Sequence, residues 1–259
     1  MRPRWRKVLR DLFEHKGRTV LVVLSIAIGV FAVGGIAGTY VIISNDMSAS
    51  YAANHPANIE VRMADFGDDL LTTVRNRDDI QDAEGRRVFS MRVRTAEDTQ
   101  WVILDVVAVD DFEHNTLNTL NPIEGATVPG KREVLLEREA LEDLHVEVGD
   151  EIVFQLPDGS LETLPVAGIV QDPTTGADDF LAPPFAYVTM STLAYLGQPE
   201  AFNRIYASVA SGEDDETHIR TVGDDLKADI ESSGYPVHRL RFALTHRHPM
   251  ASTVNAILG

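Results

Sequence analysis

The longest apolar stretch of the chain runs from Thr19 to Ile43 and contains no charged residue. As a helix rising about 1.5 Å per residue, this stretch reaches roughly 37 Å, which exceeds the hydrocarbon core of a bilayer, about 30 Å thick. A cleavable signal peptide has a shorter apolar core of about 7–15 residues, although Ser48-Ala49-Ser50 would be an acceptable cleavage site. The pattern therefore predicts a retained transmembrane helix over residues 19–43.

A second apolar pattern precedes this anchor, in residues 1–18. Five apolar residues fall on one stripe of a helix whose opposite face is basic: Trp5, Val8, Leu9, Leu12 and Phe13. This spacing is typical of an amphipathic helix that lies flat at the membrane interface. Such a helix can simply fix the topology, or it can offer a contact surface to a cytoplasmic partner. The pattern allows both.

Beyond a polar stalk at Ser44–Asn54, alternating runs predict strands and helical spacing predicts helices. They form two groups, one on each side of the middle of the chain. The first group has strands at Asn58–Met63, Arg87–Thr95 and Gln100–Val109 and a helix at Asp68–Ile80. The second group has strands at Phe185–Thr189, Asn203–Val209 and Pro236–Phe242 and helices at Ser191–Leu196 and Asp214–Ser232.

The middle segment, residues 121–183, is rich in turn dipeptides. Pro157-Asp158-Gly159-Ser160 separates the alternating runs Glu151–Leu156 and Leu161–Val170, which predicts a hairpin. Two strand-helix-strand units thus bracket a β-rich insert, and we expect a two-lobed α+β fold. We expect the domain to span residues 44–248, and the uncharged residues after it, within 249–259, to approach a second transmembrane helix.

Charge is divided unevenly along the chain. Residues 2–18 hold seven basic and two acidic residues, or +5, so the remainder of a chain with net charge −17 carries −22. The positive-inside rule places the basic flank in the cytoplasm and the acidic domain outside. An acidic domain argues against nucleic acid as a partner, because phosphate binding requires a basic surface. A halophilic origin would produce the same acidity.

Small residues recur within the anchor. Ser25 and Gly29, then Gly34 and Gly38, form small-xxx-small pairs. Such residues let another helix backbone approach closely, which is how helices associate in lipid. We therefore expect these four residues to form a helix-packing ridge in the lipid bilayer.

The middle segment carries a resemblance to a known family. The residues and short motifs that carry it occur in this order: Gly125, Lys131–Leu136, Ala140-Leu141, Leu144, Val148-Gly149-Asp150, Pro157-Asp158-Gly159 and Val166–Val170. They resemble the MacB/FtsX-like permeases of ABC transporters, in which a helix leads to a leucine-x-valine-glycine-aspartate turn, a strand, a hairpin and a valine-x-glycine-isoleucine-valine strand. One departure is Asp143, which stands where the family has glycine. The resemblance covers nearly the whole chain, as a first transmembrane helix and a MacB-like periplasmic core domain.

The residues that carry the resemblance have structural roles rather than catalytic ones. Gly149 and Asp150 fit a turn with positive φ, Gly159 belongs to the hairpin turn, and Gly168 relieves crowding in a buried strand. We identify no catalytic, cofactor-binding or metal-binding residue among them.

The resemblance implies a permease subunit with two kinds of partner, namely a second permease, identical or different, and cytoplasmic ABC ATPases. ATP would be bound by the partner, since the chain has no Gly-x-x-x-x-Gly-Lys-Ser/Thr phosphate loop and we do not expect it to be an enzyme. The family implies mechanical work on the outer domain, for export, for lipoprotein or lipid release, or for control of a cell-envelope partner. The alternative is a single-pass anchored sensor or binding module without a transport role.

Other residue types offer weaker candidates. His238, His246 and His248 lack cysteine or paired carboxylates at ligand spacing, which favours a polar approach to the membrane over a metal site. Asp172, Asp178 and Asp179 around Gly176 lack the twelve-residue calcium-loop pattern, and no serine stands in a Gly-x-Ser-x-Gly elbow. With no cysteine, the chain has neither a disulfide framework nor a thiolate zinc site.

Overall fold

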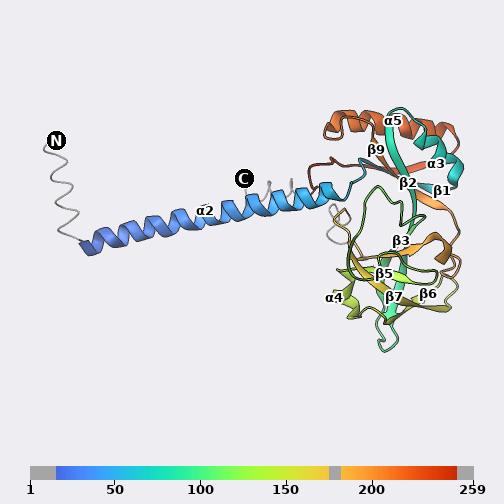
Figure 1. Ribbon diagram of the computed structural model, residues 1–259, viewed down its shortest axis with the longest axis horizontal. Helices are drawn as coiled ribbons and strands as arrows, with labels where there is room; N and C mark the ends of the chain where they lie inside the picture. Colours follow the sequence, from blue (N-terminus) through green and yellow to red (C-terminus); the bar gives the residue numbers. More distant parts are fainter. Residues whose placement is uncertain (1–15, 175–181, 250–259) are drawn as a thin grey trace. The chain divides into compact units, whose positions relative to one another are not determined.

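The structure is a computed structural model that describes residues 16–174 and 182–249 (Figure 1). The chain divides into two compact units, one up to Met47 and one from Ser48 onward. The interface stripe predicted at Trp5, Val8, Leu9, Leu12 and Phe13 lies outside the described residues, as do Gly176, Asp178, Asp179 and residues 250–259.

The first unit is built on the long helix α2 (Lys16–Ala53), whose last residues, Ser48–Ala53, belong to the second unit. Within it, Lys16–Ile36 is long and apolar enough to cross a membrane. Its large apolar side chains are exposed, with Phe31 at 81% and Val33 at 71%. The helix continues through the polar stalk as far as Ala53, because no glycine or proline interrupts Tyr40–Ala53.

The second unit is organised around one mixed sheet of ten strands, which confirms the predicted α+β class. Along the sheet the order is β10-β1-β9-β2-β3-β8-β5-β7-β4, and β6 pairs with β2 and β7. The strands are β1 (Ile59–Phe66), β2 (Ile80–Thr95), β3 (Val102–Val109), β4 (Asn121–Gly125), β5 (Val134–Glu137), β6 (Glu151–Gln155), β7 (Leu161–Gln171), β8 (Phe185–Thr189), β9 (Phe202–Val209) and β10 (Val237–Phe242).

One half of this domain consists of two strand-helix-strand units. The helices α3 (Asp68–Arg75) and α5 (Glu216–Ser232) pack with one face of β10, β1, β9 and β2. The shared core includes Leu71, Ile59, Ile205, Leu226 and Ile230. Because side chains alternate along a strand, the opposite face of these strands presents polar residues such as Glu60 and Arg62.

The other half is β-rich and holds the short helix α4 (Ala140–Leu144). Its core combines Leu136, Phe154 and Leu164 of the middle segment with Leu104 of β3 and Val188 of β8. The insert expected at 121–183 therefore shares its core with strands outside that range. The sixteen-residue strand β2 extends through both halves, pairing with β9 near its start and with β6 at its end.

Two predicted helices are shorter in the structure. The helix expected over Asp68–Ile80 ends at Arg75, because the Arg77–Asp79 ion pair closes a turn and Ile80 is buried as the first residue of β2. In the segment Ser191–Leu196 the regular element is a single 3-10 turn, η1 (Met190–Thr192). The hydroxyl of Thr189 lies 2.9 Å from that of Ser191 and 3.0 Å from that of Thr192. Such local side-chain bonds compete with a regular helix.

Candidate functional site

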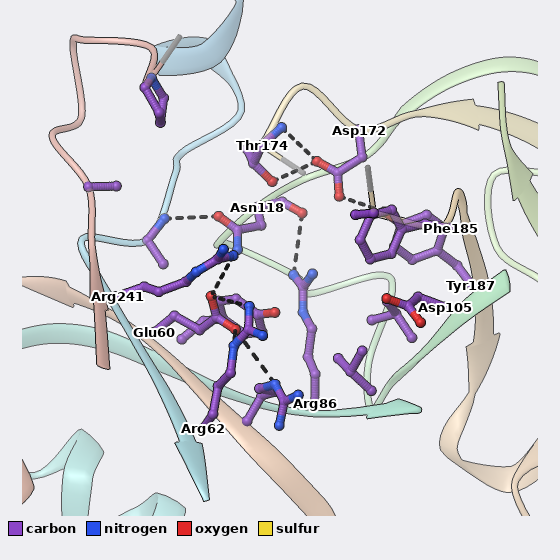
Figure 2. Close-up of a pocket in the computed structure, with 18 of the residues that line it drawn as sticks. Glu60, Arg62, Arg86, Asp105, Asn118, Asp172, Thr174, Phe185, Tyr187 and Arg241 are labelled. Carbon is purple, nitrogen blue, oxygen red and sulfur yellow. Dashed lines mark hydrogen bonds and ion pairs between the residues drawn. The ribbon is translucent and has the colours of Figure 1, made fainter. Parts of the chain in front are cut away.

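A cavity of about 300 Å³ opens on the sheet face opposite α3 and α5 (Figure 2). Strands β1, β2, β9 and β10 supply its charged wall, and β3 and β8 supply Asp105, Val107, Phe185 and Tyr187. Tyr51, in the last turn of α2, and Pro249, at the end of the described chain, also line it. The cavity is therefore lined by both the N-terminal and the C-terminal segment of the domain.

Four arginines stand in one row across β10, β1, β9 and β2, and three of them, Arg62, Arg204 and Arg86, line the cavity. In the strand register Arg239 of β10 faces Arg62 of β1, Arg62 faces Arg204 of β9, and Arg204 faces Arg86 of β2. Like charges directly opposite one another destabilise a sheet. The next row contains Arg241, Glu60, Tyr206 and Glu84, so each carboxylate lies diagonally to the arginines.

Glu60 lies at the centre of the charged wall. Arg62 Nε donates to Glu60 Oε1 at 2.7 Å, Arg204 Nε lies 3.6 Å from the same oxygen, and Arg241 Nη1 lies 4.0 Å from Oε2. The Glu60 side chain is 14% exposed. Figure 2 shows the side chains of Arg62 and Arg241 converging on Glu60. Three guanidinium groups thus share one carboxylate.

Burial and the neighbouring charge of Arg62 lower the pKa of Arg204 from its ordinary value. The charges of Glu60 and Asp105 and the hydroxyl group of Tyr206 act in the opposite direction but do not outweigh them. The cationic form of Arg204 is therefore less stable here than in water, although it remains the form present at neutral pH.

Arg86 has a different environment, since its side chain is only 3% exposed. Its Nη2 donates to Asn115 Oδ1 at 3.1 Å and to the carbonyl oxygen of Asn118 at 3.3 Å, and lies 3.2 Å from Glu84 Oε2. Its guanidinium carbon lies 5.1 Å from the centre of the Tyr206 ring. Within the described part of the chain, Arg86 Nε has no hydrogen-bond partner.

The opposite wall is aromatic and carries a satisfied carboxylate. Tyr187, fully buried, donates its hydroxyl hydrogen to Asp172 at 2.6 Å, and burial raises the pKa of Tyr187, with Asp172 adding to the effect. Asp172 also accepts from the backbone nitrogen of Thr174 at 2.8 Å. Asp172 was considered for calcium, and its carboxylate is committed to these protein donors.

The end of α2 is hydrogen-bonded to the same region. Asn54 Nδ2 donates to the carbonyl oxygen of Ser50 at 2.8 Å. The backbone carbonyl oxygen of Asn54 accepts from the backbone nitrogen of Thr119 at 3.0 Å. Asn118 Oδ1 accepts from the backbone nitrogen of Ala57 at 2.9 Å. Asn118 therefore connects Arg86 to the segment that follows α2: its backbone carbonyl oxygen accepts from Arg86, and its side chain accepts from Ala57.

The three histidines considered for a metal do not form one group among the described residues. His246 Nδ1 lies 2.6 Å from Asp214 Oδ2 and 3.8 Å from Glu213 Oε1, whereas His248 packs on Tyr51. Sequence reasoning missed these carboxylates because they precede α5, far from His246 in the chain. Glu213, Asp214 and His246 are all exposed, and exposed acidic clusters of this kind are common without a metal.

A match to a protein-family model shows which family this chain belongs to. The model, described as the MacB-like periplasmic core domain, matches residues 19–222. The chain belongs to this family. No curated protein matches it.

Two solved structures are similar to this MacB-like domain. One is the extracellular domain of the noncanonic ABC-type transporter YknZ from Gram-positive bacteria, with 14% identity, a TM-score of 0.49, and coverage of 71% of this chain and all of that one. The other is the periplasmic region of MacB from Actinobacillus actinomycetemcomitans, with 12% identity, a TM-score of 0.47, and coverage of 79% and 93% respectively.

The turn residues of the MacB-like pattern lie in the β-rich half. Gly149 has φ +99° and Gly159 has φ +85°, and the Asp150 carboxylate accepts from the backbone nitrogen of Glu147 at 2.9 Å. At Gly168 a Cβ atom would overlap the carbonyl oxygen of Ala126. None of these four residues is among those that line the cavity in the described chain.

The predicted helix-packing residues lie on exposed parts of α2. The Ser25 hydroxyl donates to the carbonyl oxygen of Leu21 at 2.9 Å, and a Cβ at Gly29, Gly34 or Gly38 would meet no atom within 4 Å. Sequence reasoning missed the arginine row. Its one local signal was an arginine at the polar position of each alternating strand, as in Ile59–Met63 and Phe202–Ala207.

Proposed function

We propose that this chain belongs to the permease subunit of an ABC transporter. In this proposal, ATP hydrolysis by a partner ATPase moves the extracytoplasmic domain. That movement drives export, releases a lipoprotein or lipid, or controls a cell-envelope partner. Membership of the MacB-like periplasmic core domain family supports an extracytoplasmic position, and the apolar segment Lys16–Ile36 supports a membrane anchor.

The observation that carries the proposal is the way in which the last turn of α2 is held in the domain. The helix α2 has no break from Lys16 to Ala53, and Tyr51 in its last turn is only 2% exposed. The following chain is then held by two hydrogen bonds, from the Thr119 backbone nitrogen to the Asn54 backbone carbonyl oxygen and from the Ala57 backbone nitrogen to Asn118 Oδ1. A displacement of the helix end would therefore strain specific bonds in the domain rather than be absorbed by a flexible linker.

The proposed partners follow from the same arrangement. A cytoplasmic ATPase would contact residues 1–18, and the domain at 44–248 would face outward. Other permease helices would pack on the pairs Ser25/Gly29 and Gly34/Gly38, which project from opposite sides of α2. We expect no catalytic role for this part of the permease.

The test uses the full-length protein and its ATPase in lipid nanodiscs, with Asn118→Ala as the variant. Loss of the Asn118 side chain removes the bond to Ala57 and should lower the transport per ATP hydrolysed several-fold, while the basal ATPase rate persists. Asn76→Ala, at the exposed end of α3, is the matched control and should leave coupling unchanged. Unchanged coupling in a correctly folded Asn118→Ala protein would refute this route. Failure to associate with any ATPase would favour the single-pass binding module.

A further inference from the structure

We propose that the cavity binds an oxyanion, a phosphate or carboxylate group, on the guanidinium groups of Arg62 and Arg204. The inference goes beyond the transporter role and does not depend on it. The same oxyanion chemistry is found in small soluble metabolites and in the headgroup of an anionic lipid.

The first argument is the imbalance of charge on the cavity wall. Arg62, Arg204 and Arg241 all lie within 4.0 Å of Glu60, whereas Glu84, the next carboxylate in that row, lies beside Arg86. Glu84 Oε1 also accepts from the backbone nitrogens of Thr116 and Leu117, at 2.7 and 2.9 Å, so this carboxylate is committed elsewhere. Among the described residues, Arg62 and Arg204 therefore share a single carboxylate, Glu60, on this wall of a domain that is acidic as a whole.

The second argument is the availability of donors. A guanidinium group carries five N–H donors in a planar fork that matches carboxylate and phosphate oxygens. Within residues 16–174 and 182–249, Arg204 makes one hydrogen bond, from Nη1 to the carbonyl oxygen of Asn203 at 3.0 Å, besides its 3.6 Å approach to Glu60. Its lowered pKa has the same origin, since burial and Arg62 leave its charge poorly compensated. An oxyanion between Arg62 and Arg204 would relieve that repulsion.

The charge of Asp105 favours the cationic forms of both Arg62 and Arg204, but the pKa of Arg204 stays lowered. Asp105 accepts from the Ser90 hydroxyl at 2.5 Å, and Asp172 accepts from Tyr187 and Thr174. Neither lies in an ion pair with Arg62 or Arg204 within 4.0 Å among the described residues. Both belong to the wall opposite the arginine row.

Size and shape limit the ligand. A volume of about 300 Å³ stands at the lower end of small-molecule sites. The aromatic rings of Phe185 and Tyr187 provide an apolar surface facing the arginines (Figure 2). The ligand class is therefore a headgroup-sized oxyanion with a short apolar part, bound next to Tyr51 and Pro249 at the two ends of the domain.

The binding test uses the whole chain in a neutral detergent and two probes, inorganic phosphate and short-chain phosphatidic acid, followed by isothermal titration calorimetry. A short-chain diacylglycerol controls for binding of the acyl chains. Saturable, salt-weakened binding of phosphate indicates a free oxyanion, and binding of phosphatidic acid alone indicates a lipid headgroup. Both results support the site, whereas saturation by neither probe up to about 10 mM overturns it.

The variant Arg204→Gln should weaken binding about tenfold or more, because one charge-assisted contact is lost. Arg92→Gln, on β2 but outside the cavity, removes the same charge and should change affinity less than about twofold. Equal losses in both variants would overturn the site. Should Arg204→Gln fail to fold, phenylglyoxal labelling of the wild-type chain decides, since bound probe must protect Arg62 and Arg204 but not Arg92.

Discussion

The rings of Tyr51 and His248 meet edge to face, with centroids 5.1 Å apart and planes inclined by 73°. Tyr51 belongs to the last turn of α2, and His248 directly precedes Pro249, where the described chain ends. Both side chains are buried, at 2% and 9% exposure. The two chain segments at the ends of the domain are therefore packed against each other, beside the arginine-lined cavity.

We expect this pair to be energetically coupled. Edge-to-face pairs contribute about 0.5–1.5 kcal/mol beyond the area they bury. In a double-mutant cycle, Tyr51→Ala and His248→Ala should together destabilise the chain by that much less than the sum of their separate effects. Urea unfolding of the detergent-solubilised chain measures the four free energies. Strict additivity would mean that the contact contributes nothing.

The glycine at position 168 gives a prediction about packing. Its Cβ would overlap backbone atoms of Ala126 and Glu124, which cannot move aside as a flexible side chain can. Gly168→Ala should therefore destabilise the domain by about 1–3 kcal/mol, the usual cost of overpacking. Gly67→Ala is the matched control, since φ is −110° there and no atom lies within 4 Å of its Cβ position. Similar melting temperatures for the two variants would contradict this explanation.

Local patterns in the sequence predicted much of the fold. The pattern predicts Phe185–Thr189 with its observed bounds, because its alternation and flanking residues are local. It does not predict the end of α3, since Leu70, Leu71, Val74 and Ile80 fit one helical stripe although Ile80 is buried in a strand. Only tertiary packing selects between these two periods.

The cavity could not be predicted in the same way. That Arg62 faces Arg204, and Arg204 faces Arg86, depends on the register of strands far apart in the chain. The net charge of −22 after the basic flank suggests an acidic surface, but a sum over the chain does not locate individual charges. The arginines of the cavity wall are therefore brought together by the register of the paired strands, which the composition of the chain does not reveal.

Topology can be tested directly because the chain has no native cysteine. We expect Ser160→Cys, in the exposed turn between β6 and β7, to react with an impermeant maleimide in intact cells. Arg2→Cys should react only after permeabilisation, because the +5 flank stays in the cytoplasm. Labelling of Arg2→Cys in intact cells would reverse the proposed orientation.

His246 should titrate above its ordinary pKa. Its hydrogen bond to Asp214, together with the charge of Asp214, raises the pKa of His246 above 6.5. The interaction therefore contributes stability below about pH 6.5, and this contribution is lost as the pH rises through the raised pKa. A histidine NMR titration should show a lower midpoint in Asp214→Asn, whereas Glu124→Gln should leave it unchanged. Equal midpoints in wild type and Asp214→Asn would refute the assignment.

The helix-packing ridge leads to a prediction for the full-length permease. If Gly34 and Gly38 contact another transmembrane helix, leucine at both positions must separate the backbones, because close approach depends on small residues. Transport should then fall, while the partner ATPase stays active but no longer responds to ligand at the outer domain. Gly35→Leu is the matched control, since at 100° per residue it projects to the side of α2 that lies between the Ser25/Gly29 pair and the Gly34/Gly38 pair. Normal coupling in a well-expressed Gly34→Leu, Gly38→Leu protein would mean that this ridge faces lipid, and that the force reaches the domain through other helices.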